Sequence, residues 1–194
     1  KTLEKFLIFN KEEWMPQTQQ KENCICFPYF RDGEMINVKY RDAKKNFKLV
    51  KDAELIFYNL SAIGERKSVI IVEGEIDCLS VYESGYGVDR DVNEETGELL
   101  NPIFSEIVPI SVPNGASKGN QRMEFLDNCS DYFIGLHDII IATDNDEAGK
   151  MLKDELIRRL GVERCKTISY PIEEVVPLQN GLKRRCKDFN EVLM

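Results

Sequence analysis

Short apolar runs and amphipathic stretches alternate along the second two thirds of the chain. The predicted strands are 68–72, 106–112, 138–143 and 164–170. The first is a continuous apolar run, as in a strand buried on both faces. The stretches with helical spacing between and after them are 77–84, 121–136 and 147–160. Strands that alternate with helices predict a parallel sheet with helices on its faces and right-handed crossovers.

The pattern before residue 67 has another period. Residues 1–20 begin with apolar positions at helical spacing, which predicts a helix that ends at Met15-Pro16. Alternating apolar and polar positions then predict antiparallel strands, with a hairpin turn at 31–34. The predicted strands are 24–30, 35–41 and 47–50. We therefore expect a subdomain of a helix plus antiparallel strands over 1–66.

The second predicted unit is an α/β domain over residues 67–194. Within it the polar stretch 89–104 is expected to be an exposed insertion loop, and 171–181 is expected to be loop. A last helix is expected from Asp188. The predicted fold class is thus α/β, with a mostly parallel sheet flanked by helices and a small α+β subdomain in front.

Composition limits the function classes. The net charge is -8, from 34 acidic and 26 basic residues, which argues against a non-specific nucleic-acid binder. No apolar run approaches 18 residues, so we expect no membrane span. No signal peptide is apparent, which favours a cytoplasmic protein. Because the chain begins at Lys1 rather than Met, we expect a fragment of a longer protein.

The cysteines do not predict a metal site. Only Cys24 and Cys26 are close together, in a spacing that zinc sites do not use, and the chain has 1 histidine. They alternate with apolar neighbours in a strand-like run. We therefore expect reduced thiols, with these two packed in a strand.

Acidic residues follow the predicted strands. Asp144 and Asp146 come directly after one strand, Glu73 after another, and Asp188 lies beyond the last. The carboxyl ends of parallel strands share one edge of a sheet, where open α/β sheets place their ligands. Carboxylates without histidine or thiolate favour Mg²⁺ or Mn²⁺, ions suited to phosphoryl chemistry. Asp144 and Asp146 would be ligands, and Glu73 a ligand or a general acid/base.

Two other interpretations of the Asp144–Asp146 pair stay open. An acid before a helix is often only an N-cap, which would suffice for Asp146. A calcium loop would place ligands at Asp144, Asp146 and Glu155, but Ala148 occupies a ligand position and a strand precedes the loop where a helix is needed. We therefore consider the calcium loop the weaker interpretation.

Basic residues supply the second candidate function. Lys39, Arg41 and Lys48 lie on the predicted antiparallel sheet, where a solvated face is slightly favoured over a phosphate-binding patch. The loop 112–119 follows another strand, and its glycines and Lys118 could approach phosphates. Its spacing is not that of a P-loop, so no ATPase motor is predicted.

The segments 72–77, 144–149 and 187–191 together resemble the acidic motifs of the Toprim domain. Residues 111–115 and the strands around 27–41 resemble, more narrowly, the primase half of phage and mitochondrial primase-helicases. The resemblance covers most of the chain.

This resemblance implies a DNA primase core that synthesises short RNA primers on a single-stranded DNA template from ribonucleoside triphosphates with Mg²⁺. The acids that match the family's catalytic and metal positions are Glu73, Asp144, Asp146 and Asp188, and Asp77 matches a further acid of the first motif. Lys39, Arg41 and Lys48 fall where the family's basic subdomain faces nucleotide and template. It also implies a host that is a bacterial or phage-infected cell.

The chain departs from complete members of that family. Their zinc-binding and helicase domains have no counterpart in its motifs, so both are expected partners missing from this fragment. Two alternatives remain: another Toprim enzyme, such as a topoisomerase or nuclease, and a non-catalytic nucleic-acid-binding module whose acids serve as caps.

Overall fold

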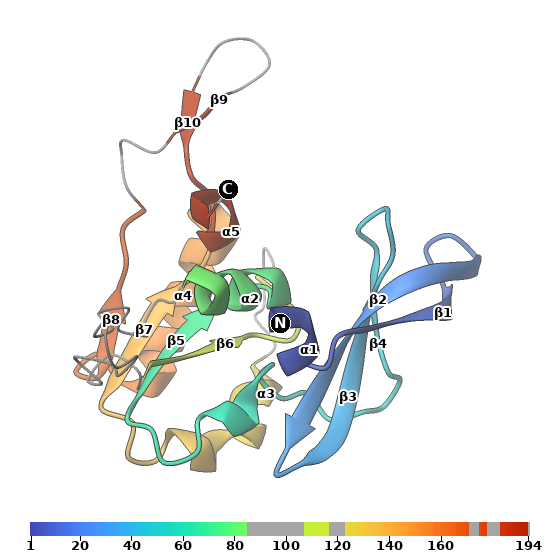
Figure 1. The fold of residues 1–194 in the computed structure, drawn as a ribbon. Coiled ribbons are helices and arrows are strands. Elements are labelled where there is room, and N and C mark those ends of the chain that lie inside the picture. The colour runs from blue at the N-terminus through green and yellow to red at the C-terminus, as the bar shows by residue number, and fades with distance from the viewer. Residues whose placement is uncertain (85–106, 117–122, 171–174, 178–182, 194) are drawn as a thin grey trace, which may run out of the picture.

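A computed structural model describes residues 1–84, 107–116, 123–170, 175–177 and 183–193. Two larger sheets lie side by side in it, an antiparallel one on the right of Figure 1 and a parallel one on the left. Predicted Lys118 and the predicted loop 89–104 lie outside the described residues. No helix in the described ranges is long and apolar enough to cross a membrane.

The antiparallel sheet holds four strands in the order β1-β2-β3-β4. The short helix α1 (Thr2–Lys5) precedes β1 (Phe9–Met15), β2 (Gln20–Arg31), β3 (Glu34–Arg41) and β4 (Phe47–Leu49). Asp32 and Gly33 have φ values of 50° and 86° and close the β2–β3 hairpin, as the turn signal predicted. The three predicted strands are therefore confirmed.

The predicted helix that begins the chain and ends at Met15-Pro16 is wrong beyond its first turn. Residues Phe9–Met15 form β1 and pair with β2, from Phe9 opposite Cys26 to Met15 opposite Gln20. The helical spacing of Leu3 and Phe6 misled the prediction, because pairing with a neighbouring strand decided the conformation of the next residues. Cys24 and Cys26 are buried, free thiols in β2, as expected.

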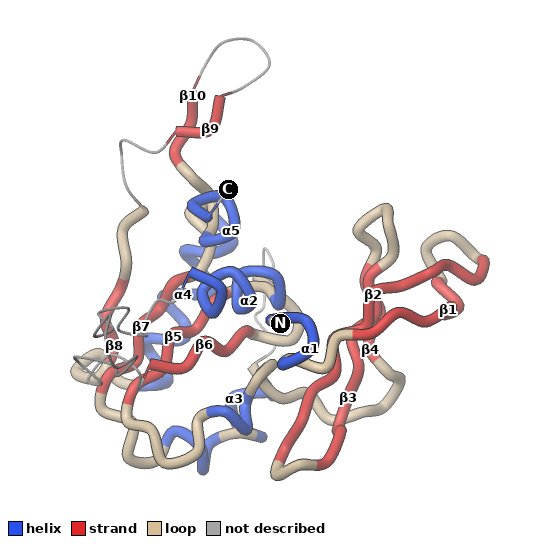
Figure 2. Tube along the Cα trace, viewed as in Figure 1, coloured by secondary structure: helices blue, strands red, loops and turns tan. Residues whose placement is uncertain are grey.

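The parallel sheet has the order β6-β5-β7-β8. Its strands are β5 (Ser68–Val72), β6 (Ile107–Ser111), β7 (Asp138–Ala142) and β8 (Cys165–Thr167), and all three pairings are parallel. Helix α2 (Glu75–Ser84) packs against β5 and β6, and α4 (Glu147–Leu160) packs against β7. The predicted α/β class with a preceding antiparallel sheet is confirmed (Figure 2).

Three boundaries differ from the predictions. The helix expected over 121–136 is only α3 (Glu124–Asn128), followed by the 3₁₀ turn η3 (Ser130–Phe133). Strand β8 is shorter than predicted. The segment expected to be loop contains β9 (Val175–Pro177), which pairs with β10 (Lys183–Arg185) before the last helix, α5 (Phe189–Leu193).

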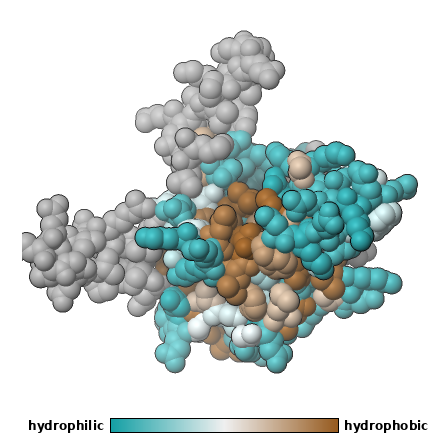
Figure 3. Space-filling model, turned by 45° about the vertical axis from the view of Figure 1, so that its right-hand side comes forward, coloured by the Kyte–Doolittle hydropathy of each residue, from teal (hydrophilic) through white to brown (hydrophobic). Residues whose placement is uncertain are grey.

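One apolar core joins the two sheets. Phe27 and Tyr29 of β2 belong to the same buried cluster as Val69 and Ile71 of β5, and Tyr58 lies between them in sequence. Tyr58 also exchanges backbone hydrogen bonds with Ser111 of β6. In the space-filling view, hydrophobic residues gather near the middle of the face, with hydrophilic ones around them (Figure 3). The two sheets are therefore held against each other by a common apolar core.

Candidate catalytic and metal site

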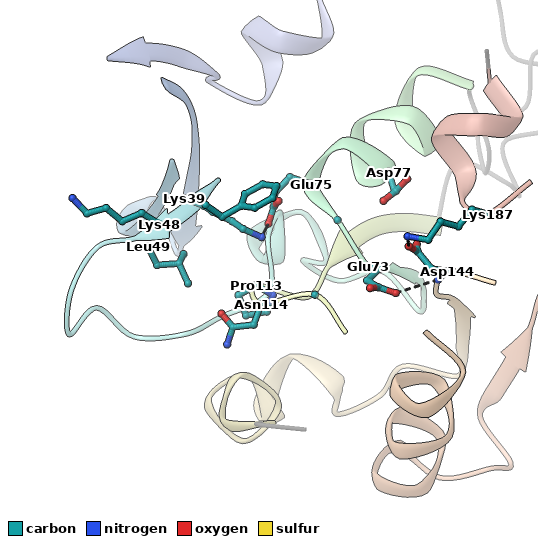
Figure 4. A pocket seen from close by; sticks show the side chains of 13 residues that line it. Lys39, Lys48, Leu49, Glu73, Glu75, Asp77, Pro113, Asn114, Asp144 and Lys187 are labelled. Atoms are coloured by element: carbon teal, nitrogen blue, oxygen red, sulfur yellow. Dashed lines mark hydrogen bonds and ion pairs between the residues drawn. The ribbon is translucent and has the colours of Figure 1, made fainter. Parts of the chain in front are cut away.

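The carboxyl ends of β5, β6 and β7 meet at one edge of the parallel sheet, beside the antiparallel sheet. A cavity of about 460 Å³ opens there. Its lining residues include Glu73, Asp77, Asp144 and Lys187 from the parallel-sheet side and Lys39, Phe47 and Leu49 from the antiparallel sheet. Figure 4 shows Glu73, Asp144 and Lys187 close together, with Asp77 above them on α2. The sequence prediction that separate acidic segments share this edge agrees with this placement.

Glu73 is fixed by backbone donors. The Ala116 amide donates to Oε1 at 2.9 Å and the Asp144 amide to Oε2 at 3.3 Å. Gly115 makes the first contact possible, because its φ of 65° turns the loop after β6 towards the carboxylate. Both oxygens are thereby oriented before any ligand binds.

Asp144 and Asp146 face a common cation. Lys187 Nζ lies 2.5 Å from Asp144 Oδ2 and 3.3 Å from Asp146 Oδ2. The backbone of Lys187 is held in place as well, since its carbonyl accepts a bond of 2.7 Å from the Asn145 amide. The two carboxylates after β7 therefore already converge on one positive charge.

Gly149 brings the start of α4 against Asp144. A Cβ on Gly149 would lie 2.2 Å from the Asp144 carbonyl oxygen, closer than any side chain tolerates. Thr143 Oγ1 donates to the Gly149 carbonyl at 2.8 Å, which fixes the same turn. The glycine is thus needed for the close packing that aims Asp144 into the cavity.

Two of the predicted ligands are also helix caps. Asp146 Oδ1 accepts the Gly149 amide at 2.9 Å, and Asp188 Oδ1 accepts the Glu191 amide at 2.9 Å. Capping uses only one oxygen of Asp146, because its Oδ2 faces Lys187. Asp146 is therefore an N-cap, as one interpretation expected, but the cap does not account for the contact of its Oδ2 with Lys187. The calcium-loop interpretation fails, because strand β7 leads into this segment.

Asp77 lies in the first turn of α2 and joins that helix to α5. The Asn190 amide donates to its Oδ1 at 3.3 Å, and Asn190 Oδ1 accepts from Ser80 at 3.1 Å. These contacts bring the segment around Asp188 to the same edge as Glu73. A segment more than 100 positions away in sequence thus contributes to the site, with Asp77 and Asn190 separated by 113 positions.

The acidic side chains of the site disfavour one another's ionised state. Burial raises the pKa of Asp77 to about 7, helped by the negative charges of Asp188 and Asp144. Burial and the Asp144 charge raise the pKa of Glu73, and burial raises the pKa of Asp144 although Lys187 opposes the effect. The pKa of Asp146 is lowered by the Gly149 amide. Such a cluster is stabilised by added positive charge.

The donor set suits Mg²⁺ or Mn²⁺ only in part. Among the described residues, no group of three acidic, histidine or cysteine side chains is arranged to hold a metal by itself. Mg²⁺ commonly uses one or two carboxylates and takes its other ligands from water and phosphate. Asp144 and Asp146, which already share the ammonium of Lys187, meet that requirement.

A buried ion pair links the antiparallel sheet to helix α2 at the rim of the cavity. Lys39 Nζ donates to Glu75 Oε1 at 2.9 Å, and the Tyr29 hydroxyl donates to the same oxygen. Both charged side chains are nearly buried, with side-chain exposures of 10% and 4%. Figure 4 shows Lys39 directed at Glu75. The charge that the sequence analysis assigned to nucleotide binding is therefore engaged with Glu75.

The other predicted basic residues are placed differently. Arg41 lies on the same sheet face as Lys39, because both are odd-numbered residues of β3. Lys48 lies opposite Tyr40 on the other face, and its ammonium contacts Glu13 Oε1 at 2.8 Å. In Figure 4 it points away from the acids. Lys39 and Lys48 both line the cavity, although their side chains lie on opposite faces of the sheet, whereas Arg41 is not among the described lining residues.

Sequence reasoning assigned no role to three residues that shape the site. Lys187 stood inside a recognised motif, Glu75 was adjacent to Glu73, and Tyr170 was only a strand residue. The Tyr170 hydroxyl donates at 3.3 Å to the carbonyls of Ala142 and Thr143, where β7 ends. Only the position of Lys187 next to Asp188 gave a signal that could have been used.

Comparison with known protein families decides the classification. The Toprim-like family model matches residues 70–193, which include Glu73, Asp77, Asp144, Asp146 and Asp188. The chain belongs to the Toprim-like family. The resemblance found in the acidic motifs is therefore confirmed.

Two of three similar proteins carry the word primase in their names. A primase homolog protein of Arabidopsis thaliana is 34% identical over 194 residues, which are 100% of this chain and 51% of that protein. A Twinkle homolog protein, chloroplastic/mitochondrial, of the same plant is 34% identical over 184 residues, 89% of this chain and 22% of that protein. The DNA helicase/primase of Enterobacteria phage T3 is 24% identical, over 92% of this chain and 25% of that protein.

A solved structure has the same fold. The primase fragment of the bacteriophage T7 primase-helicase protein has a TM-score of 0.65 and 22% identity, covering 98% of this chain and 62% of that one. The Toprim-like chain spans about half the length, or less, of the curated relatives it matches. The expected bacterial or phage-infected host is not borne out, because two of these relatives are plant proteins and one is named chloroplastic/mitochondrial.

Proposed function

We propose that this Toprim-like chain is the catalytic core of a DNA primase. It joins ribonucleotides into short RNA primers on a single-stranded DNA template during replication. One observation carries the proposal: Glu73 and Asp144 line a cavity whose other wall is the antiparallel sheet, and Asp146 shares the Lys187 ammonium with Asp144. The names of the relatives support a primase activity rather than another Toprim reaction.

Asp144 and Asp146 hold Mg²⁺ or Mn²⁺ in this proposal, with Asp188 and Glu73 as further ligands. The ion supplies charge neutralisation for the triphosphate and for the leaving pyrophosphate. Lys187 contacts the two aspartates in the chain alone. When these aspartates hold the ion, the Lys187 ammonium turns to the phosphate oxygens, because the lysine side chain is a flexible stem that carries a point charge.

Glu73 is the proposed acid/base group. Its carboxylate is oriented by the Ala116 and Asp144 amides, and its raised pKa makes it a better proton acceptor than an ordinary glutamate. It would take the proton from the attacking 3′-hydroxyl of the growing primer. Asp77 positions α5, and with it Asp188, at the same edge.

The proposed organisation is a basic subdomain over 1–66 and a catalytic domain over 67–194. Arg41 and Lys118 are the proposed contacts to nucleotide and DNA, with Lys39 and Lys48 at the rim of the cavity. A zinc-binding domain and a helicase are the proposed partners in the full-length protein. No membrane association is part of the proposal.

The test uses the double variant Asp144→Asn/Asp146→Asn. Primer synthesis on single-stranded DNA with ribonucleoside triphosphates and Mg²⁺ should fall at least about 100-fold, because the charge that holds the ion is removed. Mn²⁺ binding, followed by electron paramagnetic resonance, should be lost independently of activity. The matched control is Asp138→Asn, an acid at the opposite end of the same strand, which should behave as the parent.

Two results would contradict the proposal. The metal site is wrong if the double variant binds Mn²⁺ like the parent. The primase activity is wrong if the full-length protein makes no oligoribonucleotide. In that case, cleavage of labelled DNA with a divalent metal would indicate a nuclease- or topoisomerase-type reaction.

A further inference from the structure

Phe47 is a large apolar side chain left in contact with solvent inside the catalytic cavity. It is the first residue of β4, its exposed fraction is 44%, and it lines the cavity together with Glu73 and Asp144. Its backbone is held by Gln17, whose Nε2 donates to the Phe47 carbonyl at 2.8 Å. The ring is thus presented at a fixed place opposite the acids.

The register of the antiparallel sheet shows which side chains accompany it. Ile25, Arg41 and Phe47 form one cross-strand row, and the next row on the same face is Phe27, Lys39 and Leu49. Phe27 is buried in the core that joins the sheets, whereas Ile25 is 37% exposed. The same face therefore runs from the buried core at Phe27 to Phe47 and Leu49, which line the cavity.

Two cations flank the ring. Lys39 Nζ lies 5.1 Å from the centroid of the Phe47 ring and the Arg41 guanidinium carbon 5.9 Å from it. Lys39 is neutralised by Glu75, whereas Arg41 has no carboxylate within ion-pair distance among the residues that the structure describes. An exposed aromatic face beside a guanidinium that still has its charge available is the combination that single-stranded nucleic acids and nucleotides recognise.

We propose that Phe47 is the stacking platform for a nucleobase, with Arg41 beside it as the contact for that nucleotide's phosphate. The proposal rests on the proposed function and names the part of the substrate that the antiparallel sheet receives. The base comes either from the incoming ribonucleoside triphosphate or from the template strand. Both present the same flat π-face, and stacking of this kind does not require a particular base sequence.

The size of the cavity agrees with such an occupant. Its volume of about 460 Å³ lies within the range of small-molecule sites, roughly 300–1,000 Å³. A nucleotide whose base lies on Phe47 and whose phosphate contacts Arg41 would lie on the antiparallel-sheet side of the cavity, opposite Asp144.

The experiment measures binding with the fluorescent base 2-aminopurine, which is quenched when it stacks. One probe is 2-aminopurine riboside triphosphate and the other a single-stranded oligodeoxynucleotide that contains 2-aminopurine. The parent chain should quench at least one probe in the presence of Mg²⁺. Phe47→Leu should abolish the quench and raise the Kd of that probe about 5- to 30-fold, as expected for loss of one stacking contact.

Two variants separate stacking from folding. Phe47→Tyr retains a ring and should retain both the quench and the affinity. Phe9→Leu is the matched control, because Phe9 is similarly exposed, at 40%, but lies on the opposite face of the same sheet, paired with Cys26. It should bind both probes like the parent.

The proposal is overturned if the parent quenches neither probe, or if Phe47→Leu quenches and binds both like the parent. It is also overturned if Phe47→Tyr loses as much as Phe47→Leu. The fluorescence readout does not depend on catalysis. A negative result for Phe47 therefore does not affect the Mn²⁺-binding result for Asp144 and Asp146, and a negative Mn²⁺-binding result does not affect the result for Phe47.

Discussion

The two sides of the cavity manage charge in opposite ways. On the parallel sheet, burial and mutual repulsion raise the pKa of Glu73, Asp77 and Asp144, and Lys187 is the cation that relieves Asp144. On the antiparallel sheet, Lys39 is paired with Glu75 and Lys48 with Glu13. The charges that are unfavourable in the fold are thus the acidic ones at the edge of the parallel sheet. The two lysines of the antiparallel sheet, in contrast, each have an acidic partner.

This difference changes how a basic patch is interpreted. The two lysines look alike in sequence, yet Lys39 is buried and paired with Glu75, whereas Lys48 is paired with Glu13. Arg41, beside the Phe47 ring, has no carboxylate within ion-pair distance among the described residues. A charge that lacks a partner within the fold is the better candidate for a ligand contact.

The largest expected effect comes from the packing that holds the acidic edge together. Gly149→Ala should lower the free energy of unfolding by about 4 kcal/mol or more, because the new methyl group would overlap the Asp144 carbonyl. Denaturant unfolding checks this. The control is Gly33→Ala in the hairpin of the antiparallel sheet, where space is open and only the φ of 86° is unfavourable, for a loss of about 1 kcal/mol. Equal losses would contradict the comparison.

The next effect tests the ion pair between Lys39 of β3 and Glu75 of α2. Lys39→Met should cost about 3–5 kcal/mol of unfolding free energy, because it leaves the buried Glu75 without its cation. Lys39→Met/Glu75→Gln should recover much of that loss, because no buried charge then remains, and the Tyr29 hydroxyl can still donate to the amide oxygen. If the double variant is no more stable than the single one, the two charges do not act as a pair.

The pH dependence of stability in an Asp77 variant tests the repulsion among the acids at the sheet edge. Its pKa is about 7 in the folded chain against 3.8 for an ordinary aspartate, so the folded state holds the proton more tightly. This contribution is fully present below pH 3.8 and is lost as the pH rises through 7. Asp77→Asn, which can still accept from Asn190, should therefore stabilise the metal-free chain at pH 7 by about 2–4 kcal/mol and have little effect near pH 3.5. A stability gain that does not depend on pH would contradict this explanation.

The smallest effect is expected on the far face of the antiparallel sheet. Lys48→Met should lower stability by only about 0.2–1 kcal/mol, because its pairing with Glu13 lies near the surface. Lys48 lowers the pKa of Glu13, so this contribution is lost on acidification, opposite in sign to the Asp77 effect. Binding of the 2-aminopurine probes should be unchanged. A loss of binding as large as for Phe47→Leu would show that this face also contacts the ligand.

Much of the fold could be predicted from the sequence, because the spacing of apolar residues within a strand or helix is a local property of the chain. The runs at 68–72 and 138–143 and the helix 147–160 were placed within a residue or two, since each has a continuous apolar run or a leucine stripe with a clear end. The errors lie where pairing decided the outcome. Residues Phe9–Met15 became a strand by hydrogen bonding to β2, and Val175–Pro177 by pairing with β10.

The sequence by itself determined the acidic composition of the site, because the carboxylates follow directly on strands whose ends must share an edge. It also determined the family, through three short motifs. The tertiary structure alone decided which charges are available. Whether Lys39 meets a phosphate or Glu75, whether Lys48 pairs with Glu13, and whether Lys187 reaches Asp144 and Asp146 depend on strand register and on contacts between segments far apart in the chain. Those contacts form only when two sheets pack, and no local pattern records them.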